Sequence, residues 1–227
     1  IGPAEESDLH GRLHADGTPF ADSLPNRVEI TTPTDCPRCA TELIEVGAFI
    51  RCTNLDCPAR LERAILYWCR KLGMDGIGEK LAEQLCSTGL VKSLADLYRL
   101  KDREPELLSL DRMAEKSASN ILEELEASRS MTLSTFISAL GLPRIGPEIA
   151  SLVCSEVRTM DDLMVMTSDR ERAIERLIAI DRIGETVANL LLDGISEREG
   201  AILDLYGQIE IGEDETKSVE GPLVGTK

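Results

Sequence analysis

The amino-acid sequence predicts a mainly α-helical chain with an internal duplication, preceded by a small β-hairpin that carries four cysteines. Four of the seven cysteines lie within a stretch of 22 residues, and the chain beyond them is rich in helix-forming residues interrupted by short glycine or proline turns. Three sequence blocks in this second region recur in the same order at nearly one offset. Hydrophobic residues make up 42% of the 227, which suffices for a buried core and excludes a wholly disordered chain.

The four clustered cysteines, Cys36, Cys39, Cys52 and Cys57, follow the spacing C-x2-C-x12-C-x4-C. Each short-spaced pair lies in a turn, and the stretch between the pairs can form a hairpin that brings the two turns together. Four thiolates fill the tetrahedral coordination of zinc and leave no position for water, so we expect one structural zinc ion. A pair of disulfides is the alternative, and a chain without a signal sequence and with three further isolated cysteines disfavours it.

The remaining candidate ligands predict no second metal site. Cys69, Cys86 and Cys154 lie in helical, mostly apolar contexts, where a thiol serves as a small core residue. His10 and His14 are four residues apart and can face one side of a helix, but no residue nearby completes a coordination shell.

The helical region begins with an amphipathic segment, predicted as a helix over 59–74, and then repeats itself with a period near 68 residues. Residues 77–85 match 145–153, residues 91–100 match 157–166, and residues 110–122 match 180–191. Capping-box spacing predicts helix starts at Ser93, Thr159 and Ser168, with the partners Asp96, Asp162 and Glu171. Pro105 lies where another helix can begin.

Each half contains the same short unit twice, in which a small or basic residue and an aliphatic residue precede a helix. The four units are Gly76-Ile77-Gly78, Arg112-Met113-Ala114, Arg144-Ile145-Gly146 and Arg182-Ile183-Gly184. A glycine next to a buried aliphatic residue at a helix start makes a tight hairpin whose exposed amides, with the helix dipole, suit an anionic oxygen such as a DNA phosphate. Two such units side by side can hold both strands across a minor groove without reading bases. A plain turn between packed helices is the alternative for any single unit.

The charge distribution permits such a site but provides no broad basic surface. The formal net charge is −16, and eleven of these excess negative charges fall in residues 1–35 and 193–227. The middle of the chain is only mildly acidic and can bind phosphate through local features. Aromatic residues at 3% are too few for stacking unpaired bases, and no apolar run approaches the ~18 residues of a membrane span. The polar start at Ile1 is not a signal peptide and suggests a piece of a longer chain.

Together these features resemble the C-terminal half of the bacterial NAD-dependent DNA ligases, from about Thr34 to the last residue. In that family a four-cysteine zinc finger of this spacing leads into a domain of four helix-hairpin-helix motifs. The stretches MDGIGEKLAEQLCSTGLVKSLADLYRL and ALGLPRIGPEIA are similar to its first and third hairpin regions, and KSVEGPLVGTK (217–227) to the opening of its terminal BRCT domain. Ala114 departs from the family, which usually has glycine there.

The resemblance implies the following domains: an OB-domain remnant or linker (1–35), a four-cysteine zinc finger (36–60), a four-motif helix-hairpin-helix DNA-binding domain (61–211), and a linker into a BRCT domain (212–227). It implies a monomeric, cytoplasmic bacterial protein that grips nicked duplex DNA in replication and repair. The residues expected to contact DNA are Gly76, Ile77, Gly78, Lys80, Arg112, Lys116, Arg144, Gly146, Arg182 and Gly184.

The chemistry of ligation is expected in the rest of such a ligase. None of the seven lysines lies in the motif K-x-D-G, which in the family carries the lysine that accepts AMP from NAD. We therefore expect this chain alone to have no catalytic residue, with NAD and magnesium binding elsewhere. A non-catalytic zinc and helix-hairpin-helix scaffold for protein–protein contacts is the alternative, favoured by the acidic charge and by Ala114.

Overall fold

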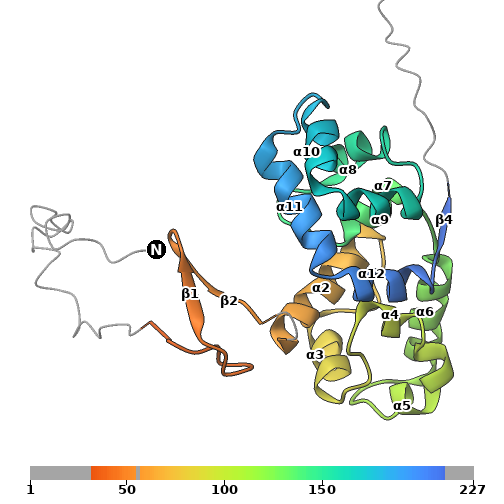
Figure 1. Cartoon of the computed structure of the whole chain (residues 1–227). Helices are drawn as coiled ribbons and strands as arrows, with labels where there is room; N and C mark the ends of the chain where they lie inside the picture. The colour runs from red at the N-terminus through yellow and green to blue at the C-terminus, as the bar shows by residue number, and fades with distance from the viewer. Residues whose placement is uncertain (1–31, 55–56, 213–227) are drawn as a thin grey trace, which may run out of the picture. The chain divides into compact units, whose positions relative to one another are not determined.

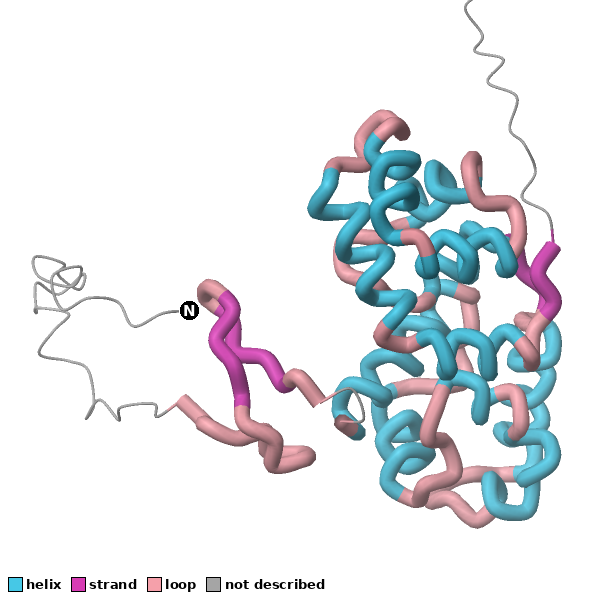
Figure 2. Tube along the Cα trace, viewed as in Figure 1, coloured by secondary structure: helices cyan, strands magenta, loops and turns pink. Residues whose placement is uncertain are grey.

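The computed structural model describes residues 32–54 and 57–212, so His10 and His14 lie outside the described residues. The chain divides into two compact units with a boundary between Thr53 and Asn54 (Figure 1). The predicted fold class is confirmed, because a small β-hairpin precedes a region built of short helices. Figure 2 shows that, within the described residues, strands occur in this hairpin and in one short pair in the larger unit.

The smaller unit contains the hairpin of β1 (Leu43–Val46) and β2 (Phe49–Cys52), which pair antiparallel with Leu43 opposite Cys52. Gly47 opens the two-residue loop with φ of 62°, a conformation that glycine adopts without steric cost. A single bridge between Asp35 and Glu42 extends the pairing toward the first two cysteines.

The larger unit places its helices around one continuous apolar core. In chain order the helices are α2 (Pro58–Lys71), α3 (Glu79–Ser87), α4 (Leu94–Leu97), the 3-10 helix η1 (Leu100–Arg103), α5 (Glu104–Leu108), α6 (Glu115–Ala127), α7 (Leu133–Ala139), α8 (Pro147–Cys154), α9 (Met160–Ser168), α10 (Arg170–Ile178), α11 (Glu185–Ser196) and α12 (Glu199–Tyr206). The short strands β3 (Ser130–Thr132) and β4 (Glu210–Gly212) pair in parallel.

The sequence duplication is a structural duplication. Helices α2, α3, α4, α5 and α6 correspond in order to α7, α8, α9, α10 and α11, with a hairpin before α3, α6, α8 and α11. The helix before the first hairpin of each half ends at a left-handed glycine, Gly73 with φ of 70° and Gly141 with φ of 67°. The helix predicted over 59–74 is therefore too long, because Gly73 terminates α2 after Lys71.

Two of the three predicted capping boxes form. Asp96 accepts hydrogen bonds from the amides of Lys92 and Ser93, and Asp162 and Thr159 bond reciprocally at the start of α9. The third prediction is wrong by one residue. Ser168 ends α9, and the side chain of Asp169 accepts the bond from the Arg172 amide instead. An aspartate beside the serine offers a stronger acceptor for that amide. Pro105 lies in the first turn of α5, as predicted.

The centre of the core is an aromatic cluster around Trp68 of α2. Trp68 is fully buried, meets the rings of Tyr98 and Phe136 edge to face, and donates from Nε1 to the Tyr98 hydroxyl at 3.0 Å. Tyr98 is also 3.2 Å from the Ser128 hydroxyl, so the polar ends of this cluster are satisfied.

The three isolated cysteines pack in the helical core, as predicted. Cys69 is buried, and burial is the main reason that its thiol pKa rises to about 12, with a smaller contribution from Glu124. Such a thiol is unreactive at neutral pH. Cys86 and Cys154 are half-buried against the same core. None of the described helices combines the length and apolar character that crossing a membrane requires.

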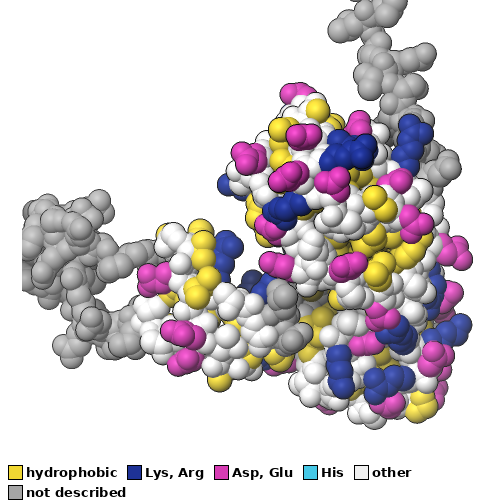
Figure 3. All heavy atoms as spheres, in the orientation of Figure 1, with side chains coloured by type: hydrophobic (Ala, Val, Ile, Leu, Met, Phe, Trp, Pro, Cys, Tyr) yellow, Lys and Arg dark blue, Asp and Glu magenta, His cyan; other side chains and the backbone are white. Residues whose placement is uncertain are grey.

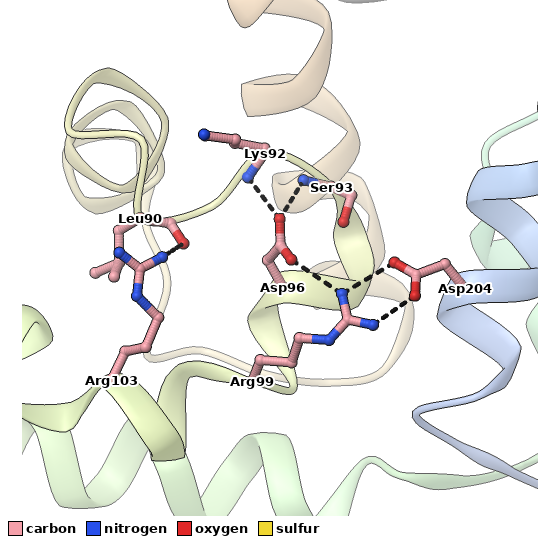
Figure 4. A network of polar contacts seen from close by, with 7 residues as sticks. All are labelled: Leu90, Lys92, Ser93, Asp96, Arg99, Arg103 and Asp204. Carbon is pink, nitrogen blue, oxygen red and sulfur yellow. Dashed lines mark hydrogen bonds and ion pairs between the residues drawn. The ribbon is translucent and has the colours of Figure 1, made fainter.

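Two sets of polar contacts join residues that are far apart in sequence. The Arg129 guanidinium lies over the Tyr98 ring and donates to the backbone oxygens of Tyr98 and Gln208, beside the β3–β4 pair. Figure 4 shows a second junction, in which Arg99, just after α4, reaches both oxygens of Asp204 on α12 and also bonds Asp96. Both sets connect the first half of the duplication with α12 or with the residue Gln208 that follows it.

Candidate nucleic-acid interface and metal centre

The four predicted metal ligands come together. The sulfur atoms of Cys36, Cys39, Cys52 and Cys57 all lie within 4.8 Å of one another, and Cys39 Sγ is 3.5 Å from Cys52 Sγ. That sulfur–sulfur distance is far longer than the ~2.05 Å of a disulfide and suits four thiolates around an ion with metal–sulfur bonds of ~2.3 Å. The cluster can therefore hold one metal ion.

Local backbone structure presents these sulfurs. Cys36 and Cys39 flank a tight turn in which the Ala40 amide donates to the Cys36 carbonyl at 2.8 Å, with Ala40 in a left-handed conformation. Cys52 ends β2, and Cys57 is the N-cap of α2, with Pro58 in the first turn.

The second candidate site consists of the four hairpins. The residues that cap the following helices, Gly78, Ala114, Gly146 and Gly184, share one extended backbone conformation, with φ between −92° and −88°. Any residue adopts this conformation, so backbone freedom does not require glycine at these positions. Ala114 adopts the same backbone conformation as the three glycines. The backbone conformation therefore does not explain why glycine occurs at the other three caps.

Packing does not explain these three glycines either. A β-carbon placed on Gly78, Gly146 or Gly184 would meet no atom within 4 Å. What glycine does provide is open access to the first backbone amides of the helix, which have no intrahelical partner. The geometry therefore suits close approach of an anion to the helix N-terminus.

In the second, third and fourth hairpins, an arginine occupies the left-handed position two residues before the cap. Arg112, Arg144 and Arg182 have φ of 59°, 64° and 69°. Each is the third residue of a turn closed by a backbone bond, such as the Ile145 amide to the Leu142 carbonyl at 3.1 Å. Glycine is the favoured residue at such a position. Keeping arginine there costs conformational energy, which is a feature of positions whose side chain has a function.

The first hairpin is built differently, which the sequence repeat did not reveal. Gly76 is not left-handed, and a β-carbon on it would lie 2.9 Å from Ile121 Cγ1 and 3.0 Å from Glu124 Oε2 on α6. Its amide donates to Glu124 Oε2 at 2.9 Å. Packing against α6 thus accounts for the glycine at position 76.

A close approach between a helix and the preceding hairpin loop also occurs in the other half, at a different pair of residues. Gly194 lies within α11 at the position that corresponds to Glu124, and a β-carbon there would lie 2.7 Å from Leu142 Cδ2 of the third hairpin. An interior helical glycine costs about 1 kcal/mol relative to alanine, so this contact accounts for its presence. A glycine within a helical pattern is the signal that would have identified it from sequence.

Cations and acids alternate at the hairpins. Lys80, Lys116 and Arg144 are exposed and form no ion pair with the described residues. The first turn of each following helix also carries an acid: Glu79, Glu115, Glu148 and Glu185. Figure 3 shows lysine and arginine interspersed with acidic side chains on the visible face of the larger unit. Any phosphate contact therefore depends on local geometry, as the charge distribution predicted.

The model of a family described as a SAM-like helix-hairpin-helix tandem matches residues 72–127 and 136–197. These two segments contain the first and second hairpins and the third and fourth hairpins, respectively. The chain belongs to this family. The tandem helix-hairpin-helix domain thus coincides with the duplicated unit of the structure.

The similar proteins with curated names are DNA ligases, which confirms the resemblance noted from the sequence. The chain is 35% identical over 175 residues to the DNA ligase of Clostridium novyi, an alignment that covers 76% of this chain and 25% of that protein. It is 36% identical over 199 residues to that of Symbiobacterium thermophilum, covering 86% and 29%, and 39% identical over 167 residues to that of Methylacidiphilum infernorum, covering 73% and 23%. The chain thus spans about a quarter of the length of these relatives.

Within the tandem domain, most residues of the four hairpin units fall into three structural groups. Gly78, Gly146 and Gly184 cap helices with open space around them, and Arg112, Arg144 and Arg182 occupy left-handed turns. The aliphatic residues Ile77, Ile145 and Ile183 are buried and anchor their hairpins in the core. Glu124 and Gly194 were missed, because only the packing of one hairpin against a distant helix gives them a role.

Proposed function

We propose that this chain is the DNA-binding part of an NAD-dependent DNA ligase and that it grips the backbone of nicked duplex DNA without regard to sequence. The observation that carries the proposal is the set of three cap glycines, Gly78, Gly146 and Gly184. Neither backbone conformation nor internal packing requires glycine at these positions, whereas approach of a phosphate to the helix amides does.

The side chains beside these glycines support backbone contact rather than base reading. Lys80, Lys116 and Arg144 are exposed at the hairpins and are not committed to ion pairs within the described residues. Few aromatic residues are present, at 3% of the chain, and Trp68, Tyr98 and Phe136 among them are buried in the core. Contacts from amides and isolated cations position a protein on DNA but carry no sequence information.

The ion at the cysteine cluster is proposed to be zinc, with Cys36, Cys39, Cys52 and Cys57 as ligands. Four thiolates select a soft, four-coordinate ion, and no fifth donor group among the described residues belongs to the cluster. Zinc would stabilise a segment too short to bury a core of its own. On this proposal 36–60 is the zinc finger and 61–211 the helix-hairpin-helix domain, between an OB-domain remnant or linker (1–35) and a linker to a BRCT domain (212–227).

The rest of the ligase would supply catalysis. We propose that the lysine that accepts AMP, the NAD site and the magnesium site belong to parts of the ligase outside this chain, and that the chain acts as a monomeric module of a cytoplasmic replication and repair enzyme. Incubation of the chain with NAD followed by intact-mass measurement should show no AMP adduct. A mass increase of one AMP would contradict the non-catalytic assignment.

Titration of a nicked duplex against the chain, followed by fluorescence anisotropy at several salt concentrations, tests DNA binding. Two duplexes of unrelated sequence should bind equally, with a log–log salt slope corresponding to roughly three to six phosphates. Gly146→Asp places a carboxylate at a proposed phosphate site and should weaken binding. Gly200→Asp is a matched control, because Gly200 also has open space around its Cα but lies on α12, which follows none of the four hairpins.

One observation favours the second candidate function, a scaffold for protein contacts. Ile44, Val46 and Phe49 share one face of the β1–β2 hairpin and are all exposed, with Phe49 at 65%. Equal binding of the parent and Gly146→Asp to nicked DNA at low salt would favour this function. Loss of binding in Gly146→Asp alone would favour the ligase module.

A further inference from the structure

An ion pair links the third hairpin to the fourth. Glu148 lies in the first turn of α8, two residues after the cap Gly146, and Arg182 lies two residues before the cap Gly184. The Arg182 guanidinium donates to Glu148 Oε1 although the two residues are 34 positions apart. The two side chains are 66% and 67% exposed, so solvent or an incoming anion can reach the pair.

Among the five cations named at the hairpins, Arg182 forms an ion pair with a residue of another hairpin. Lys80, Lys116 and Arg144 form no ion pair within the described residues, and Arg112 is 3.7 Å from its own neighbour Asp111. Arg182 likewise has its neighbour Asp181 at 3.9 Å, but Glu148 comes from a different hairpin. The backbone turn from Ile178 to Gly184 around it outlines a shallow hollow at the surface.

The Arg182 guanidinium is suited to exchange the Glu148 carboxylate for a phosphate. An exposed carboxylate–guanidinium pair contributes little to stability, so breaking it costs little. A phosphate presents more oxygen acceptors and more charge to the fork-shaped guanidinium than one carboxylate oxygen does. Arg182 keeps a left-handed φ of 69°, which glycine would adopt more easily, so its side chain is retained against the backbone preference.

We propose that Glu148 sets the DNA affinity of the third and fourth hairpins by competing with a backbone phosphate for Arg182. The inference rests on the proposed function, since it presupposes that these hairpins bind DNA. When the chain is free, Glu148 holds Arg182 between the two caps. When DNA binds, a phosphate replaces the carboxylate, and the unpaired Glu148 then repels the same phosphate. Glu148 thus limits the affinity and keeps binding reversible.

The test is a double-mutant cycle on Glu148 and Arg182, read by anisotropy with a nicked duplex at low salt. Glu148→Gln removes the competing charge and keeps the side-chain shape, and it should tighten binding by about three- to tenfold, as expected for a charge near a phosphate close to the protein surface. Arg182→Gln should weaken binding. In the Arg182→Gln background, Glu148→Gln should raise the affinity at most about twofold, because no guanidinium remains for which Glu148 and phosphate can compete.

Glu185→Gln is the matched control. Glu185 also lies in the first turn of a hairpin helix, next to Gly184, but forms no ion pair within the described residues. Any gain in DNA affinity from Glu185→Gln should be the same with and without Arg182. This control separates general repulsion of phosphate by an acidic side chain from competition for Arg182. Thermal melting of each variant checks that the fold is intact.

The outcomes distinguish this inference from the function on which it rests. If the parent binds nicked DNA and Glu148→Gln changes nothing, or gains equally in both backgrounds, competition is wrong while DNA binding stands. Weaker binding by Glu148→Gln would also overturn it and would make Glu148 a group that orients Arg182. If neither the parent nor Glu148→Gln binds nicked duplex, the proposed function itself fails.

Discussion

The backbone amide of Gly76 donates a 2.9 Å hydrogen bond to the carboxylate of Glu124, which lies 48 residues further along the chain. The first hairpin therefore presents that amide to an internal anion on α6. In the second half α11 also approaches its hairpin loop closely, at Gly194, but its partner there is Leu142, two residues before the position that corresponds to Gly76. Each half thus packs a helix closely against its hairpin loop, but the two halves use different residues for this contact.

This difference separates two glycines that look alike in sequence. Gly76→Ala should destabilise the fold by about 1–3 kcal/mol, because its β-carbon would meet the stiff, buried Ile121 side chain at 2.9 Å. Gly78→Ala should cost less than about 1 kcal/mol, because it points into open space and Ala114 already occupies the equivalent cap. Chemical denaturation measures both. Equal losses at the two positions would contradict the assignment of Gly76 to packing.

Replacing a left-handed arginine with glycine should change the stability of the fold and the affinity for DNA in opposite directions. Arg144→Gly relieves a φ of 64° and should leave stability unchanged or raise it by up to about 1 kcal/mol, while it weakens DNA binding and lowers the salt slope by about one. Arg144→Lys keeps the charge and the backbone preference, and should retain the slope. Chemical denaturation measures the change in stability, and anisotropy at several salt concentrations measures the change in DNA binding, on the same samples. An Arg144→Gly protein that binds like the parent would remove this side chain from the interface.

Metal loss should affect only the cysteine cluster. Cys52→Ser should lose about one equivalent of zinc, measured by elemental analysis of protein purified without chelator, and unfold the finger. The helical circular dichroism should persist, because the helices have their own apolar core. Cys86→Ser serves as the control, since Cys86 packs against that core and is outside the cluster, and should retain the metal. Parent protein without bound metal would refute the zinc assignment.

The aromatic cluster offers a test of the core. Tyr98→Phe removes the hydroxyl that accepts from Trp68 Nε1 at 3.0 Å and leaves a buried donor without that partner. We expect a loss of about 1–3 kcal/mol in the free energy of unfolding, with the metal content unchanged. Thermal or chemical unfolding followed by tryptophan fluorescence reports on the same residue. A loss below about 0.5 kcal/mol would mean that another group or water satisfies Trp68.

The junction of Arg99 with Asp204 should be sensitive to acid. The hydrogen bond from Arg99 is the main cause that lowers the pKa of Asp204 below its ordinary value. A carboxylate with a lower pKa when folded stabilises the fold above its unfolded pKa of about 3.9, and this contribution is lost as the pH falls through the folded value. Asp204→Asn should therefore cost up to about 1 kcal/mol at pH 7 and progressively less below about pH 4. Denaturation across this pH range measures the difference, and a constant difference down to about pH 2 would argue against the linkage.

The sequence by itself determined the elements that depend on local patterns. The cysteine spacing predicted the cluster, because two tight turns and a hairpin bring four sulfurs together with few possible arrangements. The repeat predicted four hairpins and the order of the helices, because apolar periodicity and caps such as Asp96 act within a few residues. The errors at this level were local, at Gly73 and Asp169, where a left-handed glycine ends one helix and a stronger acceptor begins another.

Only the tertiary structure decided what each hairpin residue does. Gly76 and Gly78 stand two positions apart in one motif, yet one packs against α6 and the other faces open space. The ion pair of Glu148 with Arg182 likewise joins residues that no sequence pattern connects. The physical reason is that steric room and charge pairing depend on which distant side chains lie next to a position, and that is fixed only when the hairpins and helices of each half pack together.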